Sequence, residues 1–171
     1  TEKLGDPLHP FEAFTASVCN LRPESRGHVQ IKTEDSREPP KIQPDYLSDP
    51  ADRKVAADAI KLTRKIVSSP AMKKFEPEEF KPGIEFASDD DLAREAGNIG
   101  TTIFHPVGTC KMGPSSDNMA VVDERLKVHG IRGLRVVDAS VMPTITSGNT
   151  NSPTLMIAEK ASEMILEDAL S

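Results

Sequence analysis

The sequence is poor in aromatic residues and has no long apolar segment. Phe, Tyr and Trp together make up 4% of the 171 residues, and Trp is absent. No apolar run approaches the roughly 20 residues that a membrane-spanning helix needs. The first ten residues also lack the apolar region of a secretory signal peptide. The chain therefore gives no sign of a membrane segment, and the expected location is cytoplasmic.

A net positive charge is also lacking, and cysteine is scarce. The formal net charge is −6, which disfavours nucleic acid because binding to phosphates depends on Lys and Arg. Only Cys19 and Cys110 are present, so no disulfide framework is expected and two reduced thiols are the default interpretation. On folding, a chain of this length buries roughly 70% of the surface that the unfolded chain exposes, which is enough to form a hydrophobic core.

The pattern that is present predicts an α+β fold. Residues 14–21 and 28–33 alternate between apolar and polar side chains, which predicts an antiparallel pair of strands. Residues 42–47 form a third extended piece, and the apolar run 134–137 predicts a buried strand. Residues 70–87 contain three prolines and are expected to be an extended surface segment.

Three helices are predicted from capping signals and periodicity. The first follows Asp49 as N-cap and Pro50 as first helical residue, and Pro70 stops it. The second opens at Ser88, with Asp91 in a position like that of a capping box. The third follows Ser152 as N-cap and Pro153. The apolar faces expected from the spacing are Val55, Ala59, Leu62 and Ile66 in the first helix, Leu92, Ala96, Ile99 and Ile103 in the second, and Ile157, Ala161, Met164 and Ile165 with Asp168 in the third.

The run FHPVGTCKMG at 104–113 admits several kinds of site. A zinc site needs three or four clustered ligands, but His105 and Cys110 stand alone. A phosphate loop needs Lys and Ser or Thr after the second glycine, where this chain has Pro114 and Ser115. Cys110 is better interpreted as a small buried thiol than as a nucleophile. What is left is His105 as a general base, its backbone restricted by Pro106, although a lone histidine is more often structural, as we expect for the other three.

The second informative run is GNTNSP at 148–153. Asn149 and Asn151 lie at the expected start of a helix, where free N–H groups and the helix dipole attract negative charge. A well-made helix cap explains one asparagine. It explains neither the second asparagine nor the long irregular approach from Pro143.

Read in order, these stretches resemble the C-terminal part of the glucose–methanol–choline (GMC) oxidoreductases, which are flavoproteins that oxidise alcohols. The resemblance rests on HPVGTCKMG, VVDERLKVHGIRGLRVVDASVMP and SGNTNSPTLMIAEKASEMI, and upstream on FTASVCNLRPESRGHVQIKTED and IQPDYLSDPAD. It covers residues 11–168 and is nearest to the choline dehydrogenase-like and acceptor-dependent alcohol dehydrogenase branch.

The resemblance implies a role for each matching residue. His105 matches the base that takes the hydroxyl proton, Asn151 matches the residue that holds the substrate oxygen, and Phe104 matches a position facing the substrate. Asp138 and Ala139 match the segment beside the ribityl and phosphate groups of FAD. Asn149, Asn151 and Ser152 match the part that faces the flavin ring. The implied reaction oxidises a primary alcohol to an aldehyde, with hydride transfer to flavin N5.

The resemblance also implies that the chain is part of a longer enzyme. Residues 11–103 match the substrate domain, an antiparallel sheet with flanking helices. Residues 104–171 match the catalytic loop and a strand and helix that complete the FAD domain. The N-terminal FAD-binding Rossmann part, with its G-x-G-x-x-G motif, is absent, and any targeting segment would lie there.

Three consequences follow from this missing part. We expect the fragment to be inactive and to bind FAD weakly or not at all. We also expect the run 134–137 and the apolar face of the last helix to be partly uncovered. The expected partners of that surface are the missing half or another copy of the chain.

Two alternative functions stay open, as does the substrate. The chain is alternatively a non-catalytic α+β binding or interaction module, or a relative of the hydroxynitrile-lyase type. The small number of aromatic residues favours an uncharged alcohol over a quaternary ammonium substrate, which needs an aromatic cage. The sequence does not separate oxidase from dehydrogenase.

Overall fold

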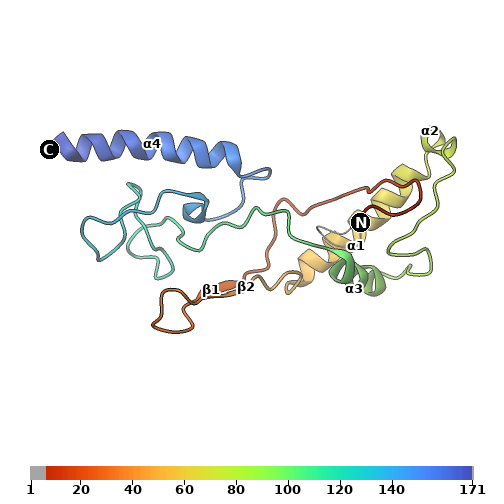
Figure 1. Ribbon diagram of the computed structural model, residues 1–171, viewed down its shortest axis with the longest axis horizontal. Helices are drawn as coiled ribbons and strands as arrows, with labels where there is room; N and C mark the ends of the chain where they lie inside the picture. The colour runs from red at the N-terminus through yellow and green to blue at the C-terminus, as the bar shows by residue number, and fades with distance from the viewer. Residues whose placement is uncertain (1–6, 171) are drawn as a thin grey trace. The chain divides into compact units, whose positions relative to one another are not determined.

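The structure, a computed structural model, describes residues 7–170 and divides them into two compact units (Figure 1). The first unit contains residues up to 27 together with 43–101, and the second contains residues 28–42 together with those from 102 onward. In the described part of the chain, no helix is both long and apolar enough to cross a membrane.

The first unit is built from helices α1 (Pro50–Val67), α2 (Pro70–Lys73) and α3 (Asp89–Ile99), and α1 packs against α3. Both predicted caps are confirmed. An Asp49 carboxylate oxygen accepts the N–H of Ala51 at 2.7 Å. The Ser88 hydroxyl accepts the N–H of Asp91 at 3.1 Å and donates to its carboxylate at 2.7 Å.

The buried face of α1 is not the one that the apolar stripe predicts. Val55, Leu62 and Ile66 are exposed, whereas Ala57 of α1 and Leu92 of α3 are fully buried. The small side chain of Ala57 allows the two helices to approach closely, and the stripe of larger side chains is left facing solvent.

The segment between α1 and α3 is also more ordered than predicted. Pro70 stops α1 but also begins the short helix α2, since its fixed φ suits the first helical position. Beyond α2, the guanidinium of Arg64 holds the irregular chain to α1. It forms two hydrogen bonds with Glu79, at 2.7 and 2.8 Å, and donates to the carbonyls of Gly83 and Phe86. The bonds from Arg64 lower the pKa of Glu79.

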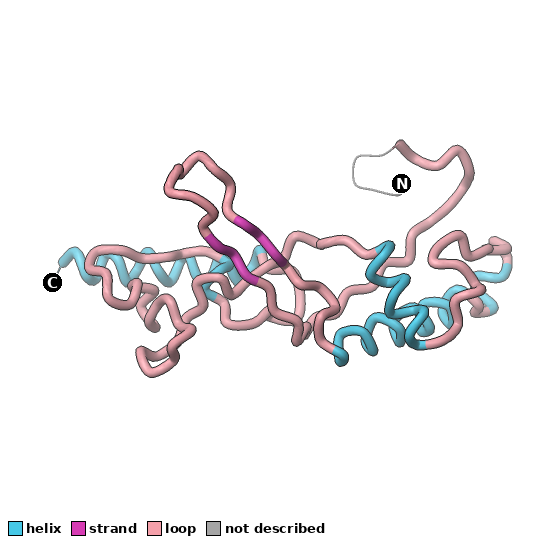
Figure 2. The backbone as a smooth tube through the Cα atoms, turned by 90° about the horizontal axis from the view of Figure 1, so that it is seen from below, coloured by secondary structure: helices cyan, strands magenta, loops and turns pink. Residues whose placement is uncertain are grey.

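The sheet has two antiparallel strands, β1 (His28–Gln30) and β2 (Lys41–Gln43), which pair with each other (Figure 2). The α+β class is thus confirmed with a much smaller sheet than expected. The predicted strand at 14–21 is wrong, because this stretch is irregular and mostly exposed. The predicted strand at 134–137 is also wrong, and its only ladder contact is an isolated bridge between Lys127 and Arg135. At 14–21 the alternation does not form a strand because no neighbouring strand among the described residues pairs with it. At 134–137 the hydrogen bonds from Val128 to Leu134 and from Val136 to Leu126 are too few to form more than this bridge.

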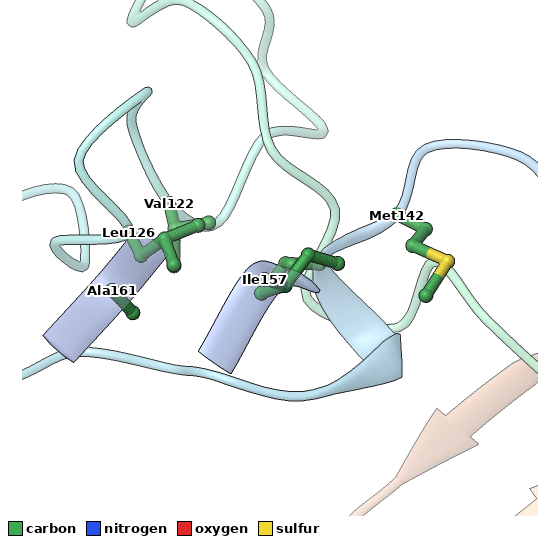
Figure 3. Packing of buried hydrophobic residues seen from close by; sticks show 6 residues of the cluster. Val122, Leu126, Met142, Ile157 and Ala161 are labelled. Atoms are coloured by element: carbon green, nitrogen blue, oxygen red, sulfur yellow. The ribbon is translucent and has the colours of Figure 1, made fainter. Parts of the chain in front are cut away.

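The second unit packs irregular chain against one long helix, α4 (Asn151–Leu170). Between residues 102 and 150 its one helical element is the 3-10 turn η1 (Ala139–Val141). Figure 3 shows Val122 and Leu126 beside Ala161 of α4. The buried cluster of this unit consists of Val122, Leu126, Val141, Met142, Ile157 and Ala161.

The buried face of α4 agrees with the predicted one except at Ile165. Ile157 and Ala161 are buried, and Met164 and Asp168 are half-buried along the same side. Ile165 is exposed. On the opposite side, Leu155, Met156, Leu166 and Leu170 are also exposed. The expected partial exposure of the predicted face is thus met at Ile165, and that of the run 134–137 at Leu134. The larger exposed apolar surface of α4 lies on the opposite side, which the prediction did not name.

Helix α4 begins before the predicted position. The N–H of Thr154 donates to the carbonyl of Thr150 at 3.1 Å, which makes the buried Thr150 the N-cap. Ser152 as N-cap is therefore wrong, and Ser152 is the second helical residue. Pro153 does not distinguish these starts, because its missing N–H is unneeded anywhere in the first turn.

A group of ion pairs fixes the end of α4 to residues 125–135. Asp168 pairs with Lys127 and Arg135, and also with Arg125 at 3.0 Å. Arg125 additionally pairs with Glu167 at 3.0 Å. The hydrogen bond from Lys127, with help from the two arginines, lowers the pKa of Asp168 to about 2 although partial burial opposes the shift.

Candidate functional site

His105 lies on an irregular segment that is constrained on both sides. Its side chain is half-buried, and Phe104 before it is 66% exposed. Phe104 has a φ of 63°, in the left-handed region that costs a non-glycine residue about 1–2 kcal/mol. Its N–H donates to the hydroxyl oxygen of Thr102 at 3.0 Å. Pro106 follows and restricts the backbone of His105 from the other side. The imidazole is therefore attached to a backbone with few alternatives.

The chain after His105 is hydrogen-bonded to η1. Cys110 donates its N–H to the carbonyl of Ser140 at 3.0 Å, and Met112 donates to that of Val141 at 2.8 Å. Gly108 has a φ of 86° and runs beside the carbonyl oxygen of Met142, which a Cβ on this glycine would meet at 3.5 Å. These contacts align residues 108–112 with residues 140–142.

Asp138 and Ala139 are at the start of the same turn. The carboxylate of Asp138 accepts the N–H of Ser140 at 2.8 Å and also its hydroxyl, so this side chain caps η1. Within residues 7–170, the backbone N–H groups of Asp138 and Ala139 have no acceptor. Two donors are therefore available at this point.

The start of α4 offers a second set of donors. The side chains of Asn149, Asn151 and Ser152 are exposed. The N–H groups of Asn151 and Ser152 belong to the first helical turn and have no acceptor among the described residues. Together with the helix dipole, these donors favour a negatively charged or carbonyl oxygen.

The structure joins some of the predicted site residues and leaves others apart. The segment carrying His105 is bonded to the turn that Asp138 and Ala139 begin, and Asn149, Asn151 and Ser152 are together at α4. The contacts among described residues include none between His105 and Asn151, so their convergence stays a prediction.

Three further observations concern the histidine and cysteine side chains. No group of His, Cys, Asp or Glu in the described part of the chain could hold a metal ion. Cys19 and Cys110 are free thiols. His129 has a structural contact, since its ring Nε2 lies 3.0 Å from the carbonyl oxygen of Gly113.

Two residues that shape the site were not found from the sequence. Thr102 and Gly108 act through backbone conformation, at φ values that the residue types alone do not specify. A Thr hydroxyl that accepts the backbone N–H two residues later forms a recognised local turn. Such turns are too common for the sequence alone to single out Thr102. The sequence marks Gly108 only as the first of two glycines, with Gly113, at the spacing of a phosphate loop.

Comparison with known proteins agrees with the resemblance seen in the sequence. Residues 23–158 match the family described as GMC oxidoreductase. The alcohol dehydrogenase [acceptor] of Pseudomonas putida is 46% identical over 90% of this chain, and the oxygen-dependent choline dehydrogenase of Cronobacter sakazakii is 47% identical over 89%. An FAD-dependent oxidoreductase from Chaetomium thermophilum superposes with a TM-score of 0.81 at 29% identity, over 87% of this chain and 26% of its own.

The matched regions cover only part of these relatives. The chain spans 27% of the length of the two bacterial dehydrogenases. The described residues thus compare with roughly the last quarter of a longer type of enzyme.

Proposed function

Because the chain belongs to the GMC oxidoreductase family, we propose that it is the C-terminal, catalytic part of an FAD-dependent enzyme that oxidises a primary alcohol to an aldehyde. The observation that carries the proposal is the half-buried imidazole of His105 on a loop that is hydrogen-bonded to η1. The likeness to an alcohol dehydrogenase and a choline dehydrogenase supports the same reaction.

In this proposal His105 is the general base. Oxidation of an alcohol removes the hydroxyl proton and a hydride from the carbon, and leaves a carbonyl. The His105 ring makes no hydrogen bond within residues 7–170, so a ring nitrogen is available for the proton. Its restricted backbone reduces the entropy lost on reaching the reactive geometry.

Asn151 and Phe104 act on the substrate beside this base. The carboxamide of Asn151 donates a hydrogen bond to the substrate oxygen, which gains negative charge as the proton leaves. The exposed ring of Phe104 lines the apolar side of the substrate position. Neither group takes or gives a proton during the reaction.

The residues present fit FAD through their N–H donors. The backbone N–H groups of Asp138 and Ala139 suit ribityl or phosphate oxygens, and the carboxylate of Asp138 is already used by Ser140. Asn149, Asn151 and Ser152, at the positive end of α4, suit the carbonyl edge of the flavin ring. The chemistry that FAD supplies when bound is acceptance of the hydride at N5.

The rest of the enzyme is expected to come from outside this chain. Residues 11–103 would belong to the substrate domain, and residues 104–171 would complete the FAD domain. The partner that covers the free side of α4 is then the N-terminal FAD-binding half. The chain alone is expected to be inactive and to hold little FAD.

A fusion enzyme tests the proposal. This chain replaces the matching 27% of the Pseudomonas putida alcohol dehydrogenase, and the FAD-loaded fusion is assayed with a panel of primary alcohols and a dye acceptor. His105→Ala is expected to lower kcat by about 10²- to 10⁴-fold at unchanged FAD content. The matched control is His28→Ala, in β1, which should have little effect.

Two results would contradict the proposal. An FAD-loaded fusion that oxidises none of the alcohols would contradict the proposed reaction. Full turnover in His105→Ala would show that His105 is not the base, although the proposed reaction itself would still stand.

A further inference from the structure

Thr102 and Phe104 form a turn directly before His105. The N–H of Phe104 donates to the hydroxyl oxygen of Thr102 at 3.0 Å, and this is the one hydrogen bond of that N–H within residues 7–170. The turn holds Phe104 at a φ of 63°. A bulky residue seldom takes this conformation, and does so only where its surroundings impose it.

Packing of the Phe104 ring does not impose the conformation. The residue is 66% exposed, so few side-chain contacts favour one backbone state over another. The helix before it does not extend this far, since α3 ends at Ile99 and the N–H of Gly100 closes its last turn on Ala96 at 2.8 Å. The hydroxyl of Thr102 is thus the group that stabilises the left-handed backbone of Phe104.

We propose that Thr102 is a positioning residue for His105. By holding Phe104 in the left-handed region, its hydroxyl sets the direction in which the chain enters His105, while Pro106 fixes the direction in which it leaves. The range of directions that the imidazole of His105 can take is thereby reduced. This inference rests on the proposed role of His105 as base and adds a residue that acts through the backbone of Phe104.

The first test measures the turn itself, in this chain and without any activity. The coupling between the amide and α protons of Phe104, read by NMR, reports its φ. Thr102→Val removes the acceptor at nearly constant shape and should move this coupling to an extended value, whereas Thr102→Ser should keep it. An unchanged coupling in Thr102→Val would overturn the inference.

The second test measures catalysis in the FAD-loaded fusion. Thr102→Val should lower kcat about tenfold, since small misplacements of a base are costly, with KM and FAD content unchanged. Thr102→Ser should restore the rate. With Phe104→Gly as background, Thr102→Val should have less than a twofold effect, because glycine enters the left-handed region freely.

Two outcomes of the second test would overturn the inference, and a third separates it from the proposed function. An equal effect of Thr102→Val on both backgrounds would contradict it. So would a loss of FAD that parallels the loss of rate, because that points to a structural role alone. Activity in His105→Ala would refute the proposed base, and with it the catalytic purpose of the turn, while the coupling of Phe104 still decides whether Thr102 holds it.

Discussion

Gly108 is the point where the loop carrying His105 passes beside the backbone of Met142. Its φ of 86° is in the left-handed region, and an added Cβ would meet the Met142 carbonyl oxygen at an ordinary contact distance of 3.5 Å. The requirement for glycine is therefore conformational. The same glycine permits the hydrogen bonds from Cys110 and Met112 to η1 that follow it.

Gly108→Ala should reduce the free energy of unfolding by about 1 kcal/mol, the order of cost of a left-handed non-glycine residue. Thermal unfolding followed by circular dichroism measures it. Gly148→Ala is the matched control, because Gly148 has no positive φ and no atom within 4 Å of the added Cβ. Equal effects at the two positions would mean that the backbone of Gly108 is not constrained.

Asp52 has a structural role that its place in the first turn of α1 does not reveal. It is 4% exposed. Its carboxylate accepts the side-chain amide of Asn20 at 3.0 Å and the N–H groups of Glu24 and Ser25 at 2.9 and 2.8 Å. Burial raises the pKa of Asp52, but the hydrogen bonds, led by Ser25, outweigh this and lower it below 3.8.

Asp52→Asn should destabilise the first unit by about 2 kcal/mol, since bonds to a charged acceptor are lost and an amide N–H₂ faces N–H donors. The matched control is Asp58→Asn, an exposed position in the same helix. Because the folded pKa is the lower one, the contribution of Asp52 is present above pH 3.8 and is lost as the pH falls below it. A variant as stable as the parent at pH 7 would contradict this role.

At the scale of elements, the last turn of α4 contains Asp168, whose negative charge the helix dipole disfavours at this end. Lys127, Arg135 and Arg125 compensate, and they keep the pKa of Asp168 at about 2. The stability that this carboxylate contributes is therefore present above its unfolded pKa of 3.8. It should be lost as the pH falls from about 4 to about 2.

Asp168→Asn should lower stability at pH 7 and flatten its pH dependence between pH 4 and 2. Urea unfolding at a series of pH values measures both. Glu167→Gln is the control, since Glu167 meets only Arg125 among the described ion pairs and should change little. A pH profile that is the same in Asp168→Asn and the parent would show that the cluster is not coupled to folding.

The elements that the sequence predicted correctly are those defined by local signals. Caps such as Asp49 and Ser88 are visible because the capping bond joins residues two or three positions apart. The strand at 14–21 failed because pairing is non-local, and β1 found its partner in β2 instead. The start of α4 was misplaced because Thr150, Asn151 and Ser152 are all residue types found at N-caps, and Ser is preferred to Thr.

The candidate site was predictable to a similar extent. His105 and Asn151 are singled out by motif order, and their roles, like those of the two sets of N–H donors, stay predictions. Thr102 and Gly108 could not be found, because their importance depends on φ angles and on backbone neighbours distant in sequence. The distance between His105 and Asn151 is likewise a property of the fold that motif spacing does not contain.

At the scale of the whole molecule, the second unit carries more apolar surface than an independent domain requires. The side of α4 away from the core presents Leu155, Met156, Leu166 and Leu170. Exposed apolar patches of this kind mark a surface that binds another part or partner. The chain spans 27% of the length of the Pseudomonas putida alcohol dehydrogenase.

Without that part, we expect this chain to self-associate through α4. Leu166→Glu removes a leucine that is 65% exposed and should shift sedimentation profiles toward monomer without changing the melting temperature. Ser162→Glu, one turn earlier on the exposed side, adds the same charge without removing apolar area and should have a smaller effect. Monomeric parent protein at high concentration would show that this surface does not pair with itself.

The two backbone bonds from Cys110 and Met112 to η1 also restrict how the length of this protein can vary. A residue inserted between His105 and Cys110, or between Val141 and Asn151, would shift His105 or Asn151 relative to the bonded stretch. A residue inserted in the hairpin tip at 34–38 would shift neither. Natural insertions and deletions should therefore accumulate at that tip and be absent from 105–112 and 141–151.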